Sequence, residues 1–567
     1  MKIEMTKLEL PIGVDDFKEI VEKEYYYVDK TLFIKELLDL KGKINVFMRP
    51  RRFGKSLNLS MLKYFFEKTE EDNSKLFEDL KIWEAGEEYR KNQGKYPVIH
   101  VSFKSTKTKS WDEMKKAFKN VIRNEFLRHE YLVSSELLNN FEKNDFKSVL
   151  LSDDNLNIDD YKMSIKNLSV YLEKHYGEKV ILLIDEYDVP LQTAYTNGFY
   201  SKAVSFISGL FQESMKDAVS LEFAVVTGCL RISKESIFTG FNNPKMISIL
   251  DESYGEHFGF EEYEVEEILN YYGFSEKFET AKKWYNGYKF GQTGIMNSWS
   301  ILNYVDKLRS NPEREPDAYW ANTSGNNIVR DLISKLDREN IVSAKNDLEV
   351  LMRGETVEKR LDVNVTYIDI DKSVENIWNM LFFTGYLTQI SKRRVGREDF
   401  YELKIPNEEV AYIYETMIAS WFNEEVLSKN FNVLYRSLLE SDVPVLTDEI
   451  NKVLGRSISY MDSQEAFYHG MMLGVLNNIP GYTIESNRET GKGRSDIMLV
   501  PLLRSKPAVI IELKSVKKFN KLKIKCEEAL RQIEEKKYGL ELREKGYEKI
   551  IKYGIAFIEK ECMVMIG

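Results

Sequence analysis

This chain contains few cysteines and no long apolar runs. The 567 residues contain three cysteines, Cys229, Cys526 and Cys562, which are widely spaced and form no CxxC pair. This excludes a disulfide framework and a cysteine-based zinc site, so we expect a reduced, intracellular protein. The longest apolar runs, such as VILLI at 180–184, are far too short to cross a bilayer. The first residues lack a signal-peptide-like apolar stretch, and we expect a soluble, cytoplasmic protein without a membrane partner.

The balance of charge argues against a protein that coats nucleic acid along its whole surface. The formal net charge is −10, within a composition of 43% hydrophobic and 30% charged residues that is ordinary for a globular protein. Charge is nevertheless uneven, because residues 485–567 carry 19 Lys and Arg against 13 Asp and Glu, a net charge of +6. An acidic body with a basic C-terminal segment is compatible with a localised nucleic-acid site.

The first half of the chain alternates short apolar segments with helical patterns. Strands are predicted at 44–48, 98–103, 180–185 and 221–228, and the spacing of apolar residues predicts a helix over 56–67. Such alternation is typical of a parallel sheet covered by helices. We therefore predict an α/β multi-domain protein that begins with a parallel, helix-covered sheet.

Beyond residue 255 the pattern becomes mostly helical. A helix running into a strand at 373–392, a charged turn and a return strand at 400–406 outline either a winged helix or a plain helix and hairpin. Farther along, strands at 482–500, 508–516 and 550–558 with a helix at about 520–546 form a compact α/β unit. The predicted domains are 1–255, 256–435 (helical, winged-helix-like) and 436–567.

The segment RPRRFGKS at 49–56 nearly matches a phosphate-binding loop, but Arg49 stands where the usual pattern has glycine. The loop follows an apolar strand and opens a helix, whose free N–H groups attract phosphate. Lys55 would reach the β- and γ-phosphates of ATP, and Ser56 would bind Mg²⁺. Arg49 does not forbid this, because backbone N–H groups make the cradle. The alternative is a basic turn that contains Gly-Lys-Ser by chance.

Further residues predicted to contact the nucleotide belong to the loop itself, namely Arg52, Phe53, Gly54 and Leu57.

A P-loop site also needs carboxylates at the end of a buried strand, and VILLIDE supplies them. Asp185 would hold Mg²⁺ through water, and Glu186 would orient or deprotonate the attacking water. The strand at 221–228 places Thr227 where it could sense the γ-phosphate, with Arg231 just beyond. Arg231 could also be a solvated arginine, or it could reach a neighbour's phosphate in a homo-oligomer.

Several longer motifs are specific enough to indicate a protein family. LPIGVDDFKEI, FMRPRRFGKSLNLSML, LLIDEYDVPL, VVTGCLRISKESIFTGFNN and WYNGYKFG resemble the bacterial AAA-ATPase-like family that carries a C-terminal PD-(D/E)XK nuclease-like domain. The match covers nearly the whole chain, and the leading arginine of the loop is the family's own form. The resemblance implies that residues 1–255 form an AAA-like ATPase domain of the additional-strand P-loop type, with Lys55 and Ser56 on the phosphates and metal. It also implies that residues 436–567 form the PD-(D/E)XK nuclease-like domain.

A second group of candidate catalytic and metal-binding residues lies near the C-terminus. GRSD ends at Asp496, and IIELK contributes Glu512 and Lys514, which share a face because side chains alternate along a strand. Two carboxylates with the Leu513 carbonyl would suit Mg²⁺ or Mn²⁺. Lys514 would position a water or offset charge on the phosphate. This is the PD-(D/E)XK arrangement, with Ser495 in place of proline.

Additional residues could complete this site. The resemblance places a buttressing Gln at Gln532. Glu465 resembles the acid on the first helix of the fold and is a candidate metal ligand, with Glu485 as its rival. His469 lies four residues after Glu465, and a lone histidine is more often structural. The lysine-rich stretch 514–525 would contact phosphates or simply be solvated.

These patterns favour an ATP-binding and ATP-hydrolysing protein coupled to a Mg²⁺-dependent nuclease that acts on DNA rather than RNA. The alternative is a nucleotide-dependent switch whose nuclease fold binds nucleic acid without cutting it. A scaffold with vestigial motifs is a third interpretation, which the complete residue sets disfavour.

Overall fold

The computed structural model describes most of the chain. Its described ranges are 7–151, 157–230, 244–320, 347–348, 350–362, 367–416, 431–457, 465–490, 493–516, 518–558 and 561–567. The chain divides by compactness into one unit of Met1–Trp320 with Glu358–Asn407, and a second of Ala321–Val357 with Glu408–Gly567. The two units are described separately below. Compactness alone does not delimit domains, so the division at residues 255 and 435 stays a prediction.

The first unit is built on a five-stranded parallel sheet in the order β2-β3-β4-β1-β5. Its strands are β1 (Ile44–Met48), β2 (Val98–Ser102), β3 (Val180–Asp185), β4 (Leu221–Gly228) and β5 (Lys245–Ile247). This confirms the predicted parallel sheet. The additional strand implied by the resemblance is β4, which lies between β1 and β3. The sequence did not indicate β5, because three residues are too few to show periodicity.

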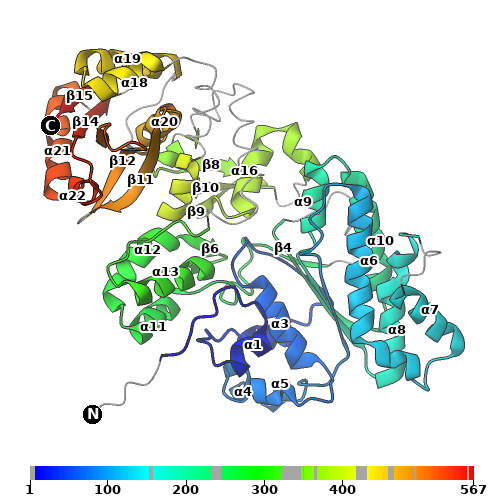
Figure 1. Cartoon of the computed structure of the whole chain (residues 1–567). Coiled ribbons are helices and arrows are strands. Elements are labelled where there is room, and N and C mark those ends of the chain that lie inside the picture. The colour runs from blue at the N-terminus through cyan, green and yellow to red at the C-terminus, as the bar shows by residue number, and fades with distance from the viewer. Residues whose placement is uncertain are drawn as a thin grey trace, which may run out of the picture. The chain divides into compact units, whose positions relative to one another are not determined.

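Helices cover both faces of this sheet (Figure 1), with α3 on one side and α8 and α10 on the other. The helix α6 shows why these segments fold as they do, because Met114, Phe118, Ile122 and Phe126 recur every four residues and are all fully buried. The helices are α1 (Phe17–Glu22), α2 (Leu32–Leu40), α3 (Lys55–Phe66), α4 (Lys81–Glu84), α5 (Glu87–Arg90), α6 (Trp111–Arg128), α7 (Asn140–Leu150), α8 (Ser164–Tyr176), α9 (Val189–Thr196) and α10 (Tyr200–Met215).

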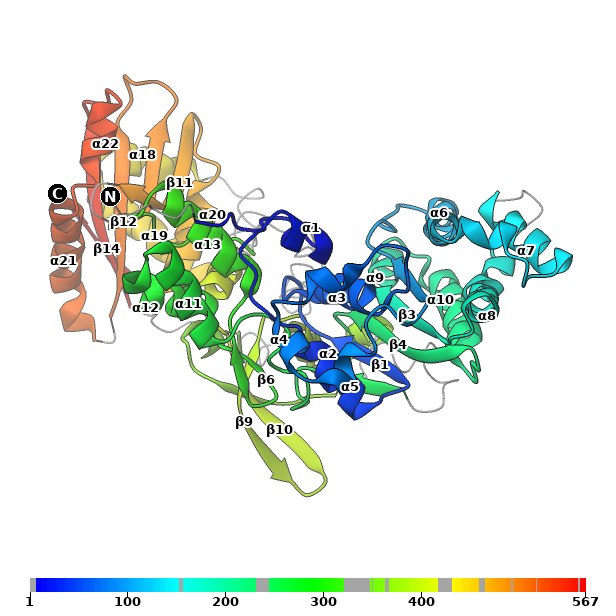
Figure 2. The same cartoon turned by 90° about the horizontal axis from the view of Figure 1, so that it is seen from below.

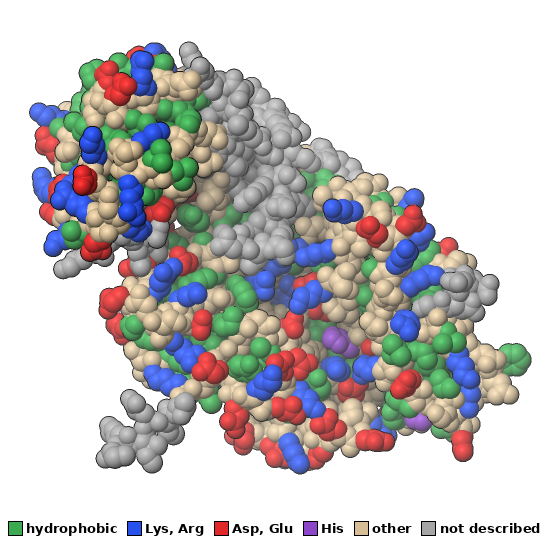
Figure 3. Space-filling model, in the orientation of Figure 1, with side chains coloured by type: hydrophobic (Ala, Val, Ile, Leu, Met, Phe, Trp, Pro, Cys, Tyr) green, Lys and Arg blue, Asp and Glu red, His purple; other side chains and the backbone are tan. Residues whose placement is uncertain are grey.

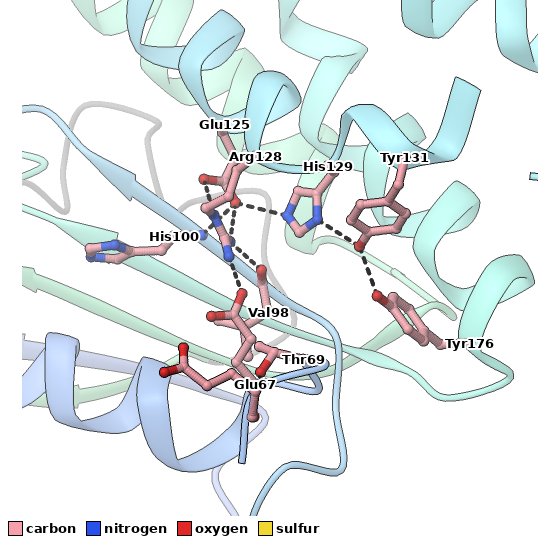
Figure 4. Close-up of polar contacts among 10 residues, drawn as sticks. Glu67, Thr69, Val98, His100, Glu125, Arg128, His129, Tyr131 and Tyr176 are labelled. Atoms are coloured by element: carbon pink, nitrogen blue, oxygen red, sulfur yellow. Dashed lines mark hydrogen bonds and ion pairs between the residues drawn. The ribbon is translucent and has the colours of Figure 1, made fainter. Parts of the chain in front are cut away.

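A buried polar network fixes the edge strand β2 against α6. Figure 4 shows Arg128 between Glu67 and Glu125, with further contacts running through His129 to the tyrosines. Arg128 donates to both carboxylates, and Glu125 accepts the backbone N–H of His100 on β2 at 2.9 Å. Because β2 pairs with β3 up to Asp185, this network also helps to position the end of β3.

The helical middle predicted after residue 255 is confirmed. Its helices pack on one another around a core that includes Leu269, Tyr285 and Tyr304. The elements are α11 (Glu262–Tyr272), α12 (Phe278–Tyr285) and α13 (Ser298–Ser310), with a hairpin of β6 (Tyr288–Phe290) and β7 (Thr293–Ile295).

The predicted helix and hairpin are also present, as α16 (Val374–Phe383), β9 (Thr388–Val395) and β10 (Glu398–Lys404). The strand β8 (Val357–Arg360) completes a small sheet in the order β8-β10-β9. The turn is shorter than expected, because Glu398 already pairs with Val395 and Gly396 takes a φ of 62°. A winged helix stays a prediction.

The second unit holds a mixed sheet in the order β11-β12-β13-β14-β15. Figure 2 shows α21 on one side of this sheet and α18–α20 on the other. The strands are β11 (Tyr482–Thr490), β12 (Gly493–Pro501), β13 (Ala508–Ser515), β14 (Ile550–Ile558) and β15 (Glu561–Ile566). The helices are α18 (Asn432–Glu440), α19 (Val443–Ser457), α20 (Glu465–Leu476), α21 (Leu522–Glu535) and α22 (Gly539–Glu544). The single helix expected over 520–546 is thus two, and β15 follows the strand expected to be last.

Short 3₁₀ turns join these elements at η1 (Asn73–Leu76), η2 (Glu130–Ser134), η3 (Asp160–Met163), η4 (Ser275–Lys277), η5 (Tyr367–Lys372) and η6 (Phe519–Lys521). Within the described ranges, no helix has the length and apolarity that crossing a membrane requires.

Candidate functional site

The loop between β1 and α3 has the backbone shape of a phosphate cradle. Gly54 is the N-cap of α3 and has a φ of 80°, while Arg52 has a φ of 69°. A Cβ added at Gly54 would meet nothing within 4 Å, so glycine serves the backbone conformation there and not a tight contact within the protein. Residues 55–57 follow as the first turn of the helix, where N–H groups have no partner within the helix. Arg49, which stands where the usual pattern has glycine, does not have a positive φ.

Lys55 closes this loop upon itself. Its side chain is buried, and Nζ donates to the carbonyl oxygens of Arg49 at 3.0 Å and Pro50 at 2.8 Å. The Sγ of Cys229, which follows β4, lies 3.6 Å from the same nitrogen. The ammonium group is therefore held at the mouth of the loop, where it can exchange carbonyl partners for phosphate oxygens.

Three residues that the sequence placed in one site meet at the ends of their elements. Ser56 Oγ donates to Asp185 Oδ2 at 2.6 Å, and Thr227 Oγ1 donates to Asp185 Oδ1 at 2.5 Å. They come from α3, β3 and β4, which converge because parallel strands end at the same edge of a sheet. A hydroxyl and a carboxylate are the donors that P-loop proteins supply to Mg²⁺, so the residues present fit that ion.

Glu186 directly follows β3 and has a φ of 52°. A glutamate seldom adopts this conformation, and strain of this kind is concentrated at functional sites. Burial, together with the charge of Asp185, raises the pKa of the Glu186 carboxyl. Both features suit a residue that accepts a proton from water.

Positive charge gathers around these carboxylates. Burial and the nearby Arg51 lower the pKa of Lys107, and Arg52 is a further source of repulsion. The Arg52 guanidinium lies over the ring of Trp299, 4.2 Å from its centroid. Like charges are costly to hold together, and an anion placed among them would relieve the repulsion. Sequence reasoning missed Arg51 and Lys107, since neither stands at a motif position with an assigned role.

Arg49 has a structural position in the core. Its side chain is fully buried and lies over the rings of Phe258 and Phe290 at 5.1 and 5.2 Å. Its Nη1 donates to the carbonyl oxygens of Met48 and Ile247, so it ties β1 to β5. Burial lowers the pKa of Arg49 to about 10. The residue that breaks the loop pattern is therefore directed away from the phosphate cradle.

Other predicted contacts have less direct positions. The Phe53 ring packs in the core against Tyr288 and Phe290, so any contact of Phe53 with a nucleotide would come from its backbone. Leu57 is half-buried in the first turn of α3. Arg231 lies outside the described residues.

In the second unit, Asp496, Glu512 and Lys514 come together at the middle of the sheet. Asp496 directly precedes Ile497, which pairs with Ile511, and Glu512 directly follows Ile511. Asp496 Oδ2 accepts the backbone N–H of Leu513 at 2.7 Å, and Lys514 Nζ lies 3.3 Å from Glu512 Oε1.

The electrostatics of this cluster show that a cation fits it. Glu512 is 1% exposed, and its Oε2 has no hydrogen-bond partner among the residues described. Burial and the neighbouring Asp496 raise the pKa of Glu512 to about 8, and burial raises that of Asp496. A buried oxygen without a donor is costly, and a divalent ion would satisfy it. No group of three or more His, Cys, Asp or Glu that could hold a metal occurs in the described ranges, so the ligand set here is small.

Gln532 and Tyr538 adjoin the same cluster from α21 and the turn after it. Gln532 Nε2 donates to the Tyr538 hydroxyl at 3.4 Å. Burial raises the pKa of Tyr538, and the charges of Glu512 and Asp496 add to this effect. Gln532 thus stands beside the cluster, as the resemblance implies.

The register of the sheet places Glu485, one of the two candidates for a further acidic ligand, on the face of the cluster. Glu485 pairs with Met498, which pairs in turn with Ile510. Paired residues share a face, and so do residues two apart, so Glu485 shares a face with Asp496 and Glu512. Glu465 begins α20, and its side chain lies outside the description.

His469 is buried below the cluster. Its Nε2 donates to the Asp496 carbonyl oxygen at 2.8 Å, and its Nδ1 lies 3.5 Å from Glu415. Burial alone would lower the pKa of His469, but Glu415 and Asp496 together raise it. The ring supports the strand that carries Asp496, which agrees with a structural role.

Comparison with known proteins identifies both parts of the chain. Residues 11–238 match a family model described as predicted AAA-ATPase, and residues 463–566 match the PD-(D/E)XK nuclease superfamily. The chain is also 26% identical to an "uncharacterized protein in vnfD 5'region" of Azotobacter chroococcum mcd 1, over 98% of this chain and 97% of that protein. The chain therefore joins an AAA-ATPase-like domain to a PD-(D/E)XK nuclease-like domain, the architecture that its motifs predict.

Proposed function

We propose that the protein binds and hydrolyses ATP in its first unit and that this activity is coupled to Mg²⁺-dependent cleavage of DNA by its second unit. The observation that carries the nuclease assignment is the buried Glu512 carboxyl, whose Oε1 lies 3.3 Å from Lys514 Nζ and whose Oε2 has no donor among the described residues. A structural strand residue would not hold a carboxylate in this state, whereas a metal ligand would.

In the ATPase unit, Lys55 and the first turn of α3 would bind the phosphates, with Arg51, Arg52 and Lys107 adding positive charge. Ser56 and Asp185 would hold Mg²⁺, which offsets charge on the phosphates when bound. Glu186 would then accept a proton from the attacking water as the bond to the γ-phosphate breaks.

In the nuclease unit, Asp496, Glu512 and the Leu513 carbonyl would hold Mg²⁺ or Mn²⁺, with Glu485 as a further ligand. The ion would polarise the phosphate when bound. Lys514 would orient a water whose oxygen bonds to phosphorus while the bond to one sugar oxygen breaks, and that oxygen takes up a proton. Gln532 and Tyr538 would keep Lys514 and Glu512 in place.

One experiment tests the nuclease directly. The full-length protein is incubated with single- and double-stranded DNA and RNA in Mg²⁺ or Mn²⁺, with and without ATP. We expect DNA cleavage that Glu512→Gln or Asp496→Asn abolishes, while Glu527→Gln, an exposed acid on α21, retains it. Cleavage that persists in Glu512→Gln would refute the metal site.

A second candidate is a nucleotide-controlled switch that binds DNA without cutting it. The β9–β10 hairpin favours it, because it projects from its unit (Figure 2) and its basic residues Arg393, Arg394 and Arg397 are exposed. In this proposal α16 and the hairpin act as a winged-helix-like DNA contact. ATP-dependent DNA binding without cleavage in any of the conditions above would support the switch.

A further inference from the structure

The segment that leaves β13 combines lysines with an aromatic side chain beside the nuclease cluster. Residues 514–525, here called the lysine segment, contain six lysines and no acidic residue. It begins with Lys514 of the cluster, passes through η6 and enters α21. Its chemistry therefore bears on what approaches Asp496 and Glu512.

Phe519 is the one exposed aromatic side chain among the described residues of this unit. Its side chain is 61% exposed, whereas Tyr468, Tyr538 and Tyr553 are at most 1% exposed. The contrast with Leu522 is informative, because Leu522 is 2% exposed and packs with Val516, Cys526 and Ala556. The segment thus buries its leucine and leaves its phenylalanine in solvent, at a cost that a ligand would offset.

The charges around Phe519 identify the kind of ligand. Lys518 and Lys521 flank it, Lys523 follows, and all three are exposed without an ion pair in the part of the chain described. Lys525 pairs with Glu528 at 2.6 Å. A protein partner would meet an unfavourable surface here, since lysine is depleted in the cores of protein interfaces. A polyanion with flat apolar groups is the complementary ligand.

Chain geometry keeps Phe519 near the cluster. Five residues separate it from Lys514, so the two Cα atoms are at most about 17 Å apart. That span equals about five stacked nucleotides of one strand. The α21 helix is close as well, because Lys525, and after it Lys514, lowers the pKa of Glu528.

We propose that Phe519 stacks on an unpaired base of the DNA strand to be cut, while Lys518 and Lys521 contact its backbone phosphates. The inference rests on the proposed nuclease function and specifies its substrate as single-stranded DNA or an unpaired end. In duplex DNA the face of each base is covered by its neighbours, so only an unpaired base offers a face to the ring.

Binding measurements separate stacking from charge. The full-length Glu512→Gln protein is titrated in Mg²⁺ into fluorescently labelled single-stranded DNA and into a blunt duplex of the same sequence. We expect Phe519→Ala to weaken single-strand binding about 5- to 150-fold, with little change for the duplex, and Phe519→Tyr to restore it. Leu502→Ala is the matched control, because Leu502 is 70% exposed and follows the other end of β12.

Salt dependence gives a second readout. Lys521→Ala should reduce the slope of log affinity against log salt by about 0.7, whereas Phe519→Ala should leave that slope unchanged. Equal single-strand affinity of Phe519→Ala and its parent would overturn the inference, even if the wild type cleaves DNA. Conversely, Phe519-dependent binding without cleavage by the wild type would uphold the stacking of Phe519 on an unpaired base and would refute the nuclease activity.

Discussion

The Ser56 hydroxyl donates a 2.6 Å hydrogen bond to the Asp185 carboxylate, although the two residues are 129 positions apart. The bond joins the start of α3 to the end of β3, and Thr227 of β4 binds the other oxygen of the same carboxylate. All three side chains therefore meet where the phosphates of a nucleotide would end.

The first prediction concerns nucleotide binding. Lys55→Ala should weaken ATP affinity by at least about tenfold, because it removes a charged donor to phosphate. Lys63→Ala on the same helix is the control and should bind ATP as the wild type does. Isothermal titration calorimetry measures both, and unchanged affinity in Lys55→Ala would show that the loop is not the nucleotide site.

The second prediction separates binding from hydrolysis. Glu186→Gln keeps the shape of the side chain but cannot accept a proton, so ATP hydrolysis should fall about 100-fold or more while ATP still binds. Phosphate release and nucleotide binding are measured on the same preparation. A variant that hydrolyses ATP normally would remove Glu186 from the reaction.

The third prediction concerns Arg49. Restoring the usual glycine by Arg49→Gly should destabilise the first unit by about 3 kcal/mol or more, because it empties a buried site between two aromatic rings. Lys107→Ala, in contrast, should lower ATP affinity and have little effect on thermal stability. Calorimetric unfolding and ATP titration of both variants test the contrast. A stable Arg49→Gly protein that has lost ATP binding would contradict it.

The fourth prediction concerns pH and metal at the nuclease cluster. Because the pKa of Glu512 is raised from 4.5 to about 8, the folded unit must take up a proton that the unfolded chain does not hold. The resulting cost is absent below about pH 4.5, grows as pH rises and levels off above pH 8. Without metal, Glu512→Gln should therefore raise the free energy of unfolding at pH 8 by about 2–4 kcal/mol. At pH 5 it should hardly change that free energy, and thermal unfolding at the two pH values measures the difference.

The same experiment has a metal arm. Mg²⁺ should stabilise the wild type and not Glu512→Gln, because only the carboxylate binds the ion. The Glu527→Gln control should follow the wild type in both arms. A Glu512→Gln protein that is less stable than the wild type at pH 8 without metal would contradict the prediction.

The fifth prediction concerns the network of Figure 4. Burial alone would raise the pKa of Glu125, but Arg128 and His129 lower it well below its ordinary range. Its contribution to stability is therefore complete above about pH 4.5 and is lost as pH falls further. Glu125→Gln should cost about 3–5 kcal/mol at pH 7 and should flatten the acid limb of the stability profile.

Denaturant unfolding between pH 3 and pH 8 measures this effect. The exposed neighbour Glu130→Gln should change neither the stability nor its pH dependence. A Glu125→Gln profile parallel to that of the wild type would refute the prediction.

Local patterns were sufficient to predict most of the fold. The four principal strands of the first sheet are apolar throughout, since a parallel strand is covered on both faces, and this makes them visible in sequence. The strand pair β12–β13 and its Asp496, Glu512 and Lys514 were equally visible, because period-two alternation sets the face of each side chain. The short strand β5 is formed by long-range pairing with β1, which leaves no local signal.

The surroundings of the sites depend on contacts that sequence does not reveal. Arg51 and Arg52 of the loop after β1 lie close enough to Lys107 of the segment after β2 to lower its pKa, although β3 and β4 separate the two strands. The structural role of Arg49 is hidden in the sequence for the same reason, because its partners Phe258 and Phe290 lie more than 200 residues away.

Arg49 has one consequence for communication within the first unit. Its guanidinium joins the loop after β1 to Phe258 and to Phe290 of the β6–β7 hairpin, which leads into α13. A displacement of the backbone beside Lys55 would therefore act on the rings stacked on Arg49. The unusual first residue of the loop thus places the loop and the helical segment in one continuous series of contacts.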